Sequence, residues 1–213
     1  MSDKLREWME KGVLLGDGGY LLELERRGYV DSGSRKEKVG TGRGSGQYTP
    51  EVAIEHPEAL RGLHQEFLRA GSRVLQALTF YGTREKLTRA GYGSQTEEIN
   101  AAAVRIAREA AAGRALVAGT ISRTQLFESE GPSAGPHVRD LFTEQVRLLQ
   151  AAGVDFFMLE TFFNLEEMRI ALECVRERGL PIVATMSFRP DPTKSADGRT
   201  VAECARIMEA EGA

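Results

Sequence analysis

Short apolar runs alternate with amphipathic helical segments along most of the chain, and this alternation restricts the fold more than any other feature. The runs are almost continuously hydrophobic, which is typical of strands that are buried on both faces. Helical segments between such strands act as crossovers, so we expect the strands to be parallel neighbours. The predicted strands are Val13–Gly16, Val74–Phe80, Ala115–Ile121, Phe156–Phe162 and Pro181–Phe188.

The helical segments have clear boundaries. Apolar residues recur at helical spacing within each segment, and a glycine follows each one, at the position where a left-handed cap residue is favoured. Five strand-and-helix units of this kind fit a doubly wound sheet or an arc of a (β/α)₈ barrel, and the pattern alone does not separate the two. The predicted helices are Pro57–Ala70, Thr96–Ala112, His137–Ala152, Leu165–Arg178 and Thr200–Ala210.

The last residues, Glu211–Ala213, form a turn that should lead into a sixth strand. A parallel barrel that is left open exposes strand edges and an unfilled core. We therefore expect residues 1–213 to be the N-terminal part of an incomplete (β/α)₈ TIM barrel, with about its first five units and a single domain. The stretch 31–47 is rich in Gly, Ser and charged residues, which predicts a flexible surface loop.

Composition excludes several classes of partner. The 213 residues carry 28 basic and 31 acidic side chains, a formal net charge of −3, which gives no electrostatic reason to bind nucleic acid or an acidic membrane. The N-terminus lacks the apolar run of a signal peptide, and no segment approaches the roughly 20 apolar residues of a membrane span. The two cysteines, Cys174 and Cys204, have no disulfide or metal-ligand spacing, which favours helix packing in a reducing cytoplasm.

Polar and aromatic residues follow several of the predicted strands. Asp17 lies among glycines, which allow a ligand to approach the backbone closely, although an aspartate there could equally form a turn and cap the next helix. Glu160 ends an otherwise apolar strand, so its carboxylate calls for a cationic partner, either a ligand ammonium group or a basic side chain. Phe80 and Tyr81 offer aromatic faces that suit a methylated cation, or they simply pack. Ligands of parallel α/β proteins gather at these strand ends.

The three histidines, His56, His64 and His137, show no metal-ligand spacing, so we expect them to be surface or helix-capping residues. No nucleophile elbow or phosphate-binding loop occurs in the sequence.

Several of these motifs together resemble the homocysteine S-methyltransferase family. The similarity extends from residue 12 to residue 213, apart from the stretch 31–47, and is greatest for the betaine–homocysteine S-methyltransferase branch. It rests on the order and spacing of the motifs rather than on a single one. The motifs are Gly16–Gly19, Tyr48–Glu51 followed by Glu55–Ala59, Phe67–Ser72, Leu78–Tyr81 and Leu159–Phe162.

Members of this family are zinc-dependent (β/α)₈ barrels that transfer a methyl group from betaine or a related onium donor to the zinc-activated thiolate of homocysteine, which gives methionine. The resemblance implies that Asp17 and Glu160 help to hold the amino acid, with Glu160 facing its ammonium group. It also implies that Tyr81 belongs to the pocket around the methyl donor, and that Gly18 and Tyr20 line the same mouth.

Two positions depart from the betaine branch. Thr161 stands where those enzymes carry a tyrosine after the glutamate, and Tyr48 stands where they carry a tryptophan. The aromatic cage is therefore smaller, which leaves open S-methylmethionine or another sulfonium compound as the donor.

The resemblance also implies that the zinc is held by three cysteines, which would all lie beyond Ala213, because neither cysteine of this chain matches them. We therefore assign no catalytic residue or metal ligand here, and expect the isolated chain to be inactive. The expected partners are the small-molecule substrates, without nucleic acid or membrane, and homo-oligomerisation stays open. An alternative of another class is a truncated, non-catalytic binding module or partner subunit.

Overall fold

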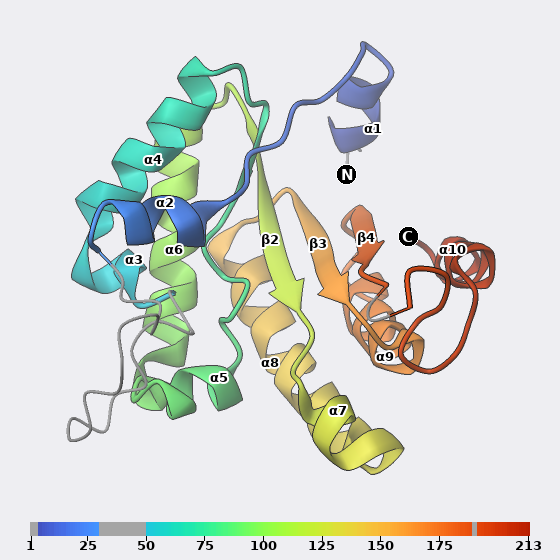
Figure 1. Cartoon of the computed structure of the whole chain (residues 1–213). Coiled ribbons are helices and arrows are strands. Elements are labelled where there is room, and N and C mark those ends of the chain that lie inside the picture. The colour runs from blue at the N-terminus through green and yellow to red at the C-terminus, as the bar shows by residue number, and fades with distance from the viewer. Residues whose placement is uncertain (1–3, 30–49, 189–190) are drawn as a thin grey trace.

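Four parallel strands form the central sheet. The computed structural model describes residues 4–29, 50–188 and 191–213. Within this part of the chain the strands pair in the order β1-β2-β3-β4, without a reversal. Figure 1 shows β2, β3 and β4 side by side. A doubly wound sheet reverses its strand order at a switch point, so the sequential order is consistent with part of a TIM-barrel-like fold. The strands are β1 (Val74–Gln76), β2 (Leu116–Ser122), β3 (Phe156–Phe162) and β4 (Ile182–Met186).

The prediction of a first strand at Val13–Gly16 is wrong in its extent. This segment makes only an isolated parallel bridge, between Gly16 and Val74. The amides of Arg73 and Val74 donate to the Leu15 carbonyl, over 2.7 and 3.3 Å. Val13, in contrast, is 97% exposed, so most of the apolar run is not buried against the sheet. The segment nevertheless brings Asp17 beside β1, because the Asp17 amide donates to the Val74 carbonyl over 3.2 Å.

The five long predicted helices are present, and each boundary lies within two residues of its prediction. β1 is shorter than predicted, because the chain turns after Gln76 and the Thr79 amide donates to the Ala77 carbonyl over 2.7 Å. The loop predicted at 31–47 lies outside the described residues. The helices are α1 (Lys4–Met9), α2 (Tyr20–Arg26), α3 (Val52–Glu55), α4 (Pro57–Arg69), α5 (Arg84–Arg89), α6 (Thr96–Ala111), α7 (Leu126–Glu130), α8 (Gly135–Ala152), α9 (Leu165–Arg176) and α10 (Val201–Ala210), with 3₁₀ turns η1 (Gly93–Gln95) and η2 (Gly131–Ala134).

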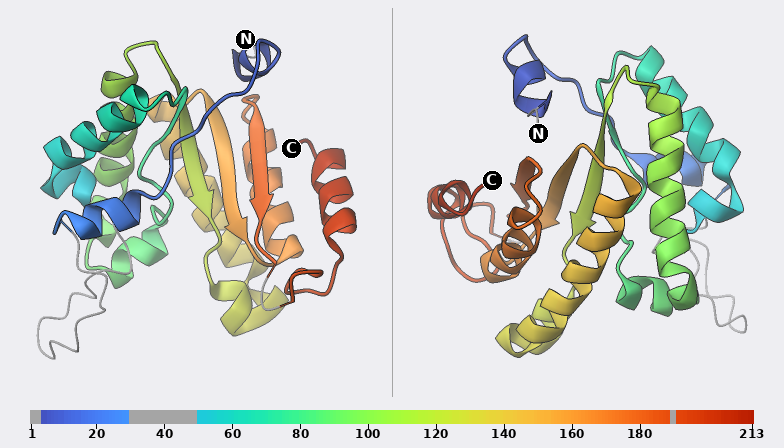
Figure 2. Two further views of the ribbon diagram at one scale, coloured as in Figure 1. Left: turned by 45° about the horizontal axis from the view of Figure 1, so that its top comes forward. Right: turned by 180° about the vertical axis from the view of Figure 1, so that it is seen from behind.

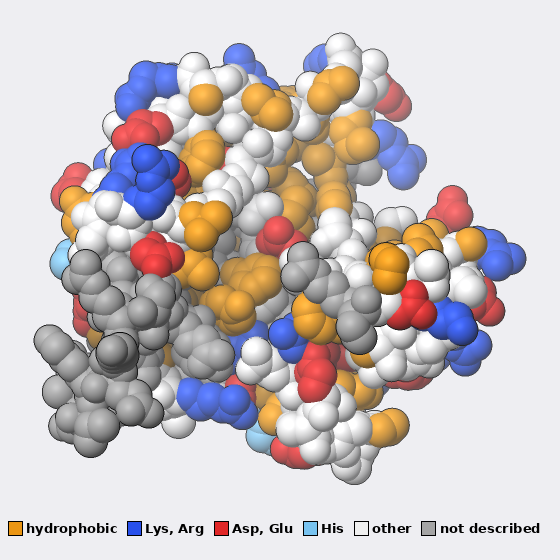
Figure 3. Space-filling model, in the orientation of Figure 1, with side chains coloured by type: hydrophobic (Ala, Val, Ile, Leu, Met, Phe, Trp, Pro, Cys, Tyr) orange, Lys and Arg blue, Asp and Glu red, His pale blue; other side chains and the backbone are white. Residues whose placement is uncertain are grey.

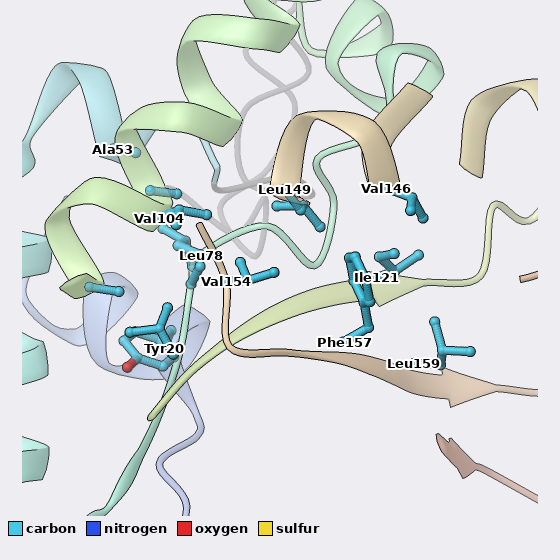
Figure 4. Packing of buried hydrophobic residues seen from close by; sticks show 14 of the residues in the cluster. Tyr20, Ala53, Leu78, Val104, Ile121, Val146, Leu149, Val154, Phe157 and Leu159 are labelled. Atoms are coloured by element: carbon cyan, nitrogen blue, oxygen red, sulfur yellow. The ribbon is translucent and has the colours of Figure 1, made fainter. Parts of the chain in front are cut away.

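The two faces of the sheet are covered differently. Helices α6, α8 and α9 pack on one face, where Val117, Phe157 and Leu159 join the main hydrophobic core (Figures 2 and 4). Residues of alternate position point to the opposite face, as in any strand. There Phe156 joins a smaller cluster around Leu5 of α1, near the amino ends of the strands. The carboxyl-end half of this second face is the place where polar residues gather.

Burial decreases from β2 through β3 to β4. All seven residues of β2 are buried, whereas none of the five residues of β4 is fully buried. Among the described strands β4 pairs only with β3, which leaves its other edge without a neighbouring strand. Within the described residues, no helix is both long enough and apolar enough to cross a membrane.

Candidate functional site

A pocket of about 240 Å³ opens at the carboxyl ends of β1 and β3. Figure 3 shows this side of the molecule, where an acidic side chain lies among hydrophobic ones in the hollowed middle of the face. Four of the residues predicted from the sequence line the pocket directly: Gly18, Tyr20, Tyr81 and Glu160. The full lining is Gly18, Gly19, Tyr20, Leu21, Gln76, Ala77, Leu78, Phe80, Tyr81, Glu160 and Thr161.

Asp17 lies directly beside this pocket and is held by the first strand. Its two carboxylate oxygens accept hydrogen bonds from the backbone amide of Gln76, at 3.0 and 3.1 Å. The Tyr20 hydroxyl donates to the same carboxylate. The side chain has no exposed surface. Burial raises the pKa of Asp17 to about 7, against the opposing effect of these hydrogen bonds, and the negative charge of nearby Glu160 raises it further.

Glu160 lies on the pocket face of β3. Phe157 and Leu159 point into the main core. Successive side chains of a strand point to opposite faces, so Glu160 shares the other face with Met158. Burial raises the pKa of its carboxyl above the ordinary value. No side chain of the described residues forms an ion pair with Glu160, and its charge is close enough to raise the pKa of another acid, Asp17, beside the pocket. Two neighbouring, partly desolvated carboxyl groups favour the binding of a cation close to them.

The backbone of β3 is irregular where it presents Glu160. The pairing with β4 shifts register between Leu159 and Phe162, and Thr161 has a φ of 62°, in the left-handed region. A positive φ is unusual for a β-branched residue and is typical of functional sites. The Thr161 amide donates to Oγ1 of Thr185 over 3.3 Å, which holds this bulge in place. Bulges next to binding sites redirect side chains, and here the affected residue is Glu160.

Tyr81 forms the aromatic wall of the pocket. Its ring meets Phe80 edge to face, with 4.6 Å between the centroids. The ammonium group of Lys86 lies 4.4 Å from the Tyr81 centroid and is hydrogen-bonded to Ser122 Oγ at 3.2 Å. Lys86 is 1% exposed, and burial lowers its pKa to about 7. Sequence analysis missed Lys86, because nothing in its local sequence indicates a buried lysine that supports a pocket residue.

Tyr20 lines the pocket, but its hydroxyl is already engaged. It donates to Asp17 and lies 2.6 Å from Nδ1 of His64. The prediction that His64 is a surface or capping residue is therefore wrong, since the side chain is completely buried. The sequence did hold a signal, because His64 stands four residues from both Leu60 and Leu68 and so belongs to the apolar stripe of α4.

Tyr48, the remaining predicted site residue, lies outside the described residues. No group of three or more His, Cys, Asp or Glu side chains in the described part of the chain could hold a metal ion. Cys174 and Cys204 are both free and buried, on helices α9 and α10. Burial raises the pKa of each thiol, which disfavours the thiolate form that zinc requires. Neither cysteine therefore fits a zinc site here.

Comparison with models of known protein families identifies the family of this chain. The model of the homocysteine S-methyltransferase family matches residues 14–213. The chain belongs to the homocysteine S-methyltransferase family. The resemblance seen in the sequence motifs is thus confirmed across almost the whole chain.

The curated relatives are named for two different methyl donors. Betaine–homocysteine S-methyltransferase 1 from Rattus norvegicus is 40% identical over 207 residues, which cover 94% of this chain and 47% of the relative. S-methylmethionine–homocysteine S-methyltransferase from Pongo abelii is 39% identical over 187 residues, which cover 87% of this chain and 46% of the relative. The chain thus spans about half the length of most of the curated relatives that it matches.

Solved structures of a family member support the fold. The homocysteine methyltransferase MmuM from Escherichia coli, in its oxidized form, superimposes with a TM-score of 0.79 at 20% identity. The match covers 99% of this chain and 75% of that protein. The same protein has also been solved in a metallated form, with a TM-score of 0.76.

Proposed function

We propose that this chain forms the amino-acid-binding side of a homocysteine S-methyltransferase, in about the first five units of a (β/α)₈ barrel. The observation that carries the proposal is the pair of carboxyl groups, Glu160 in the pocket and Asp17 directly beside it, without a basic ion-pair partner for Glu160 among the described residues. An amino acid brings an ammonium group, which would neutralise this pair. Family membership supports homocysteine as that amino acid.

The methyl donor would lie against the aromatic wall. In the proposed reaction the thiolate sulfur of homocysteine, which has already lost its proton, forms a bond to a methyl carbon, the bond from that carbon to the onium atom breaks, and the donor leaves with the electron pair. Tyr81 would hold the onium group by cation–π attraction, with Phe80 at its edge. Asp17 and Glu160 would fix the amino acid so that the sulfur is aligned with the methyl carbon.

Betaine and a sulfonium donor remain the two candidates. Relatives at nearly equal identity are named for betaine and for S-methylmethionine. Thr161 lines the pocket next to Glu160 and offers no ring to a trimethylammonium group. This observation favours a sulfonium donor, which carries fewer methyl groups around its charged atom.

Zinc, which the resemblance implies for the family, has no ligand set among the described residues, and neither cysteine fits. The roles proposed for this chain are therefore binding and orientation. The expectation that the zinc ligands follow Ala213 stays a prediction. The two free cysteines suit the reducing cytoplasm, which we propose as the location of the protein.

Calorimetric titration of the chain with homocysteine tests the proposal. Glu160→Gln keeps the shape of the side chain but removes its charge, so we expect roughly ten- to a hundredfold weaker binding. Glu166→Gln is the matched control, because Glu166 is an exposed residue of the following helix, and it should leave the affinity unchanged. Equal affinity of wild type and Glu160→Gln would show that the Glu160 carboxylate is structural, and a wild-type chain that does not bind homocysteine would contradict the proposed function.

A further inference from the structure

Three buried side chains from three separate segments form a chain of hydrogen bonds behind the pocket. The Tyr20 hydroxyl of α2 donates to Oδ2 of Asp17. The hydroxyl oxygen of Tyr20 also lies 2.6 Å from Nδ1 of His64 on α4. Nδ1 and Oδ2 are 4.0 Å apart, so the hydroxyl bridges them. The side chains of Asp17 and His64 have no exposed surface, and Tyr20 is 6% exposed. Figure 4 shows the Tyr20 ring among the buried hydrophobic residues.

The number of available protons determines which group donates and which accepts in this chain of hydrogen bonds. The Tyr20 hydroxyl has one hydrogen, and when that hydrogen points to Asp17 the oxygen must accept from Nδ1. His64 is neutral, because burial lowers its pKa to about 3, so its single ring proton is then on Nδ1. This tautomer leaves Nε2 as a bare nitrogen, and Nε2 is indeed buried without a hydrogen-bond partner in the described part of the chain.

The reverse direction is less favourable for two reasons. It places the ring proton of His64 on Nε2, where a buried N–H would have no acceptor, and orphaned N–H groups are rare in proteins. It also turns the Tyr20 hydroxyl toward His64 and removes a donor from Asp17. Hydrogen bonds to a charged carboxylate are stronger than those between neutral groups. Both effects favour the arrangement in which His64 donates to Tyr20 and Tyr20 donates to Asp17.

We propose that Tyr20 and His64 are positioning residues that hold the Asp17 carboxyl in place beside the pocket and favour its ionised form. The Tyr20 ring is fixed by His64 and Phe67, with centroids 5.1 and 5.3 Å away. With the Gln76 amide, its hydroxyl supplies the hydrogen bonds that offset burial and the nearby charge of Glu160. The idea that an ionised Asp17 serves to bind a ligand ammonium group rests on the proposed function. The hydrogen bonds among His64, Tyr20 and Asp17 do not depend on it.

Nuclear magnetic resonance of the labelled chain tests the proposal without any ligand. The ¹⁵N shifts of the His64 ring should show a neutral Nδ1–H tautomer. The ¹³C shift of the Asp17 carboxyl, followed against pH, should give a pKa that Tyr20→Phe raises by about one pH unit, because a donor to the charged form is lost. Tyr29→Phe is the matched control, since Tyr29 is an exposed tyrosine that faces another histidine, His56, and it should change nothing.

Variants of His64 separate positioning from simple packing. His64→Leu fills the space but cannot donate, so the pKa of Asp17 should rise. His64→Asn places an amide donor near the position of Nδ1 and should restore most of the wild-type value. An Nε2–H tautomer in the wild type, or a pKa of Asp17 that Tyr20→Phe leaves unchanged, would overturn the proposal.

Titration with homocysteine then distinguishes the two proposals. If the tautomer and the Asp17 titration are as expected but wild type does not bind homocysteine, the hydrogen-bond chain stands and the proposed function fails. If wild type binds and Tyr20→Phe weakens binding mainly below the raised pKa of Asp17, both stand. Equal loss of affinity at all pH values would assign Tyr20 a packing role instead and contradict the positioning proposal.

Discussion

Asp17 shows at the scale of a single residue how a binding site opposes stability. Its pKa is about 7 in the folded chain, against an ordinary value of 3.8. Between these two pH values the folded chain retains a proton that the unfolded chain has lost, so the stability contributed by this group decreases as the pH rises. Above pH 7 the full cost of burying the charge is present, and it amounts to at most about 4 kcal/mol.

Asp17→Asn should therefore stabilise the chain in a pH-dependent way. The gain in unfolding free energy should be small near about pH 4, grow as the pH rises, and level off above about pH 7. Urea unfolding of wild type and variant at several pH values measures it. A gain of the same size at every pH would mean that the Asp17 carboxyl is not the titrating group.

Tyr81 leads to a prediction about charge rather than shape. Tyr81→Leu keeps an apolar wall but removes the ring, so an onium donor should bind roughly threefold to thirtyfold more weakly, as expected for a cation–π contact. A neutral isostere, in which a carbon atom replaces the onium nitrogen of betaine, should lose much less affinity. Competition binding with both compounds makes the comparison. Equal losses for the cation and the isostere would argue that Tyr81 acts by packing alone.

At the scale of elements, the sequence predicted those features that depend on neighbours along the chain. The helix α8, for example, follows from its apolar stripe and its cap at Gly153, which has a φ of 90°. Asp17, Glu160 and Tyr81 could be predicted to lie near one another because the carboxyl ends of parallel strands meet at one edge of a sheet. His64 was missed because its partner, Tyr20, is 44 residues away, and no local pattern encodes such a contact. The prediction of a strand at Val13–Gly16 was wrong for a related reason, since hydrophobicity does not reveal which apolar runs are buried.

The turn after β1 gives a prediction for one element. Gly82 follows Tyr81, and a Cβ atom there would lie 2.6 Å from Asn100 Oδ1 and 2.9 Å from the Thr79 carbonyl oxygen. Gly82→Ala should therefore destabilise the chain by about 1–3 kcal/mol and displace the aromatic wall. Gly62→Ala is the control, because Gly62 lies within α4 with no atom near its Cβ position, and it should stabilise by about 0.5–1 kcal/mol. Chemical unfolding of both variants is sufficient, and a neutral Gly82→Ala would show that the turn can relax.

At the scale of the whole molecule, the site lies between parts of unequal burial. β2 is buried along its entire length between two neighbouring strands, whereas β4 is only partly buried and pairs on one side among the described strands. Glu160 belongs to β3, the strand between these two extremes. The carboxyl pair therefore depends on the well-buried strands for its position and on the less buried edge for the geometry around Thr161.

Native-state hydrogen exchange should show this gradient directly. Amide hydrogens exchange after local opening of the structure. The free energy of this opening approaches the global free energy of unfolding in buried strands and is much smaller at exposed edges. We expect the slowest exchange in β2, slow exchange in the first half of β3, and clearly faster exchange in β4 and in α1, which is six residues long and buries only Leu5. Mass spectrometry of peptides from the exchanged chain resolves these segments. Protection of β4 equal to that of β2 would contradict the gradient and would mean that its second edge is covered in solution, by another part of the protein or by a second copy.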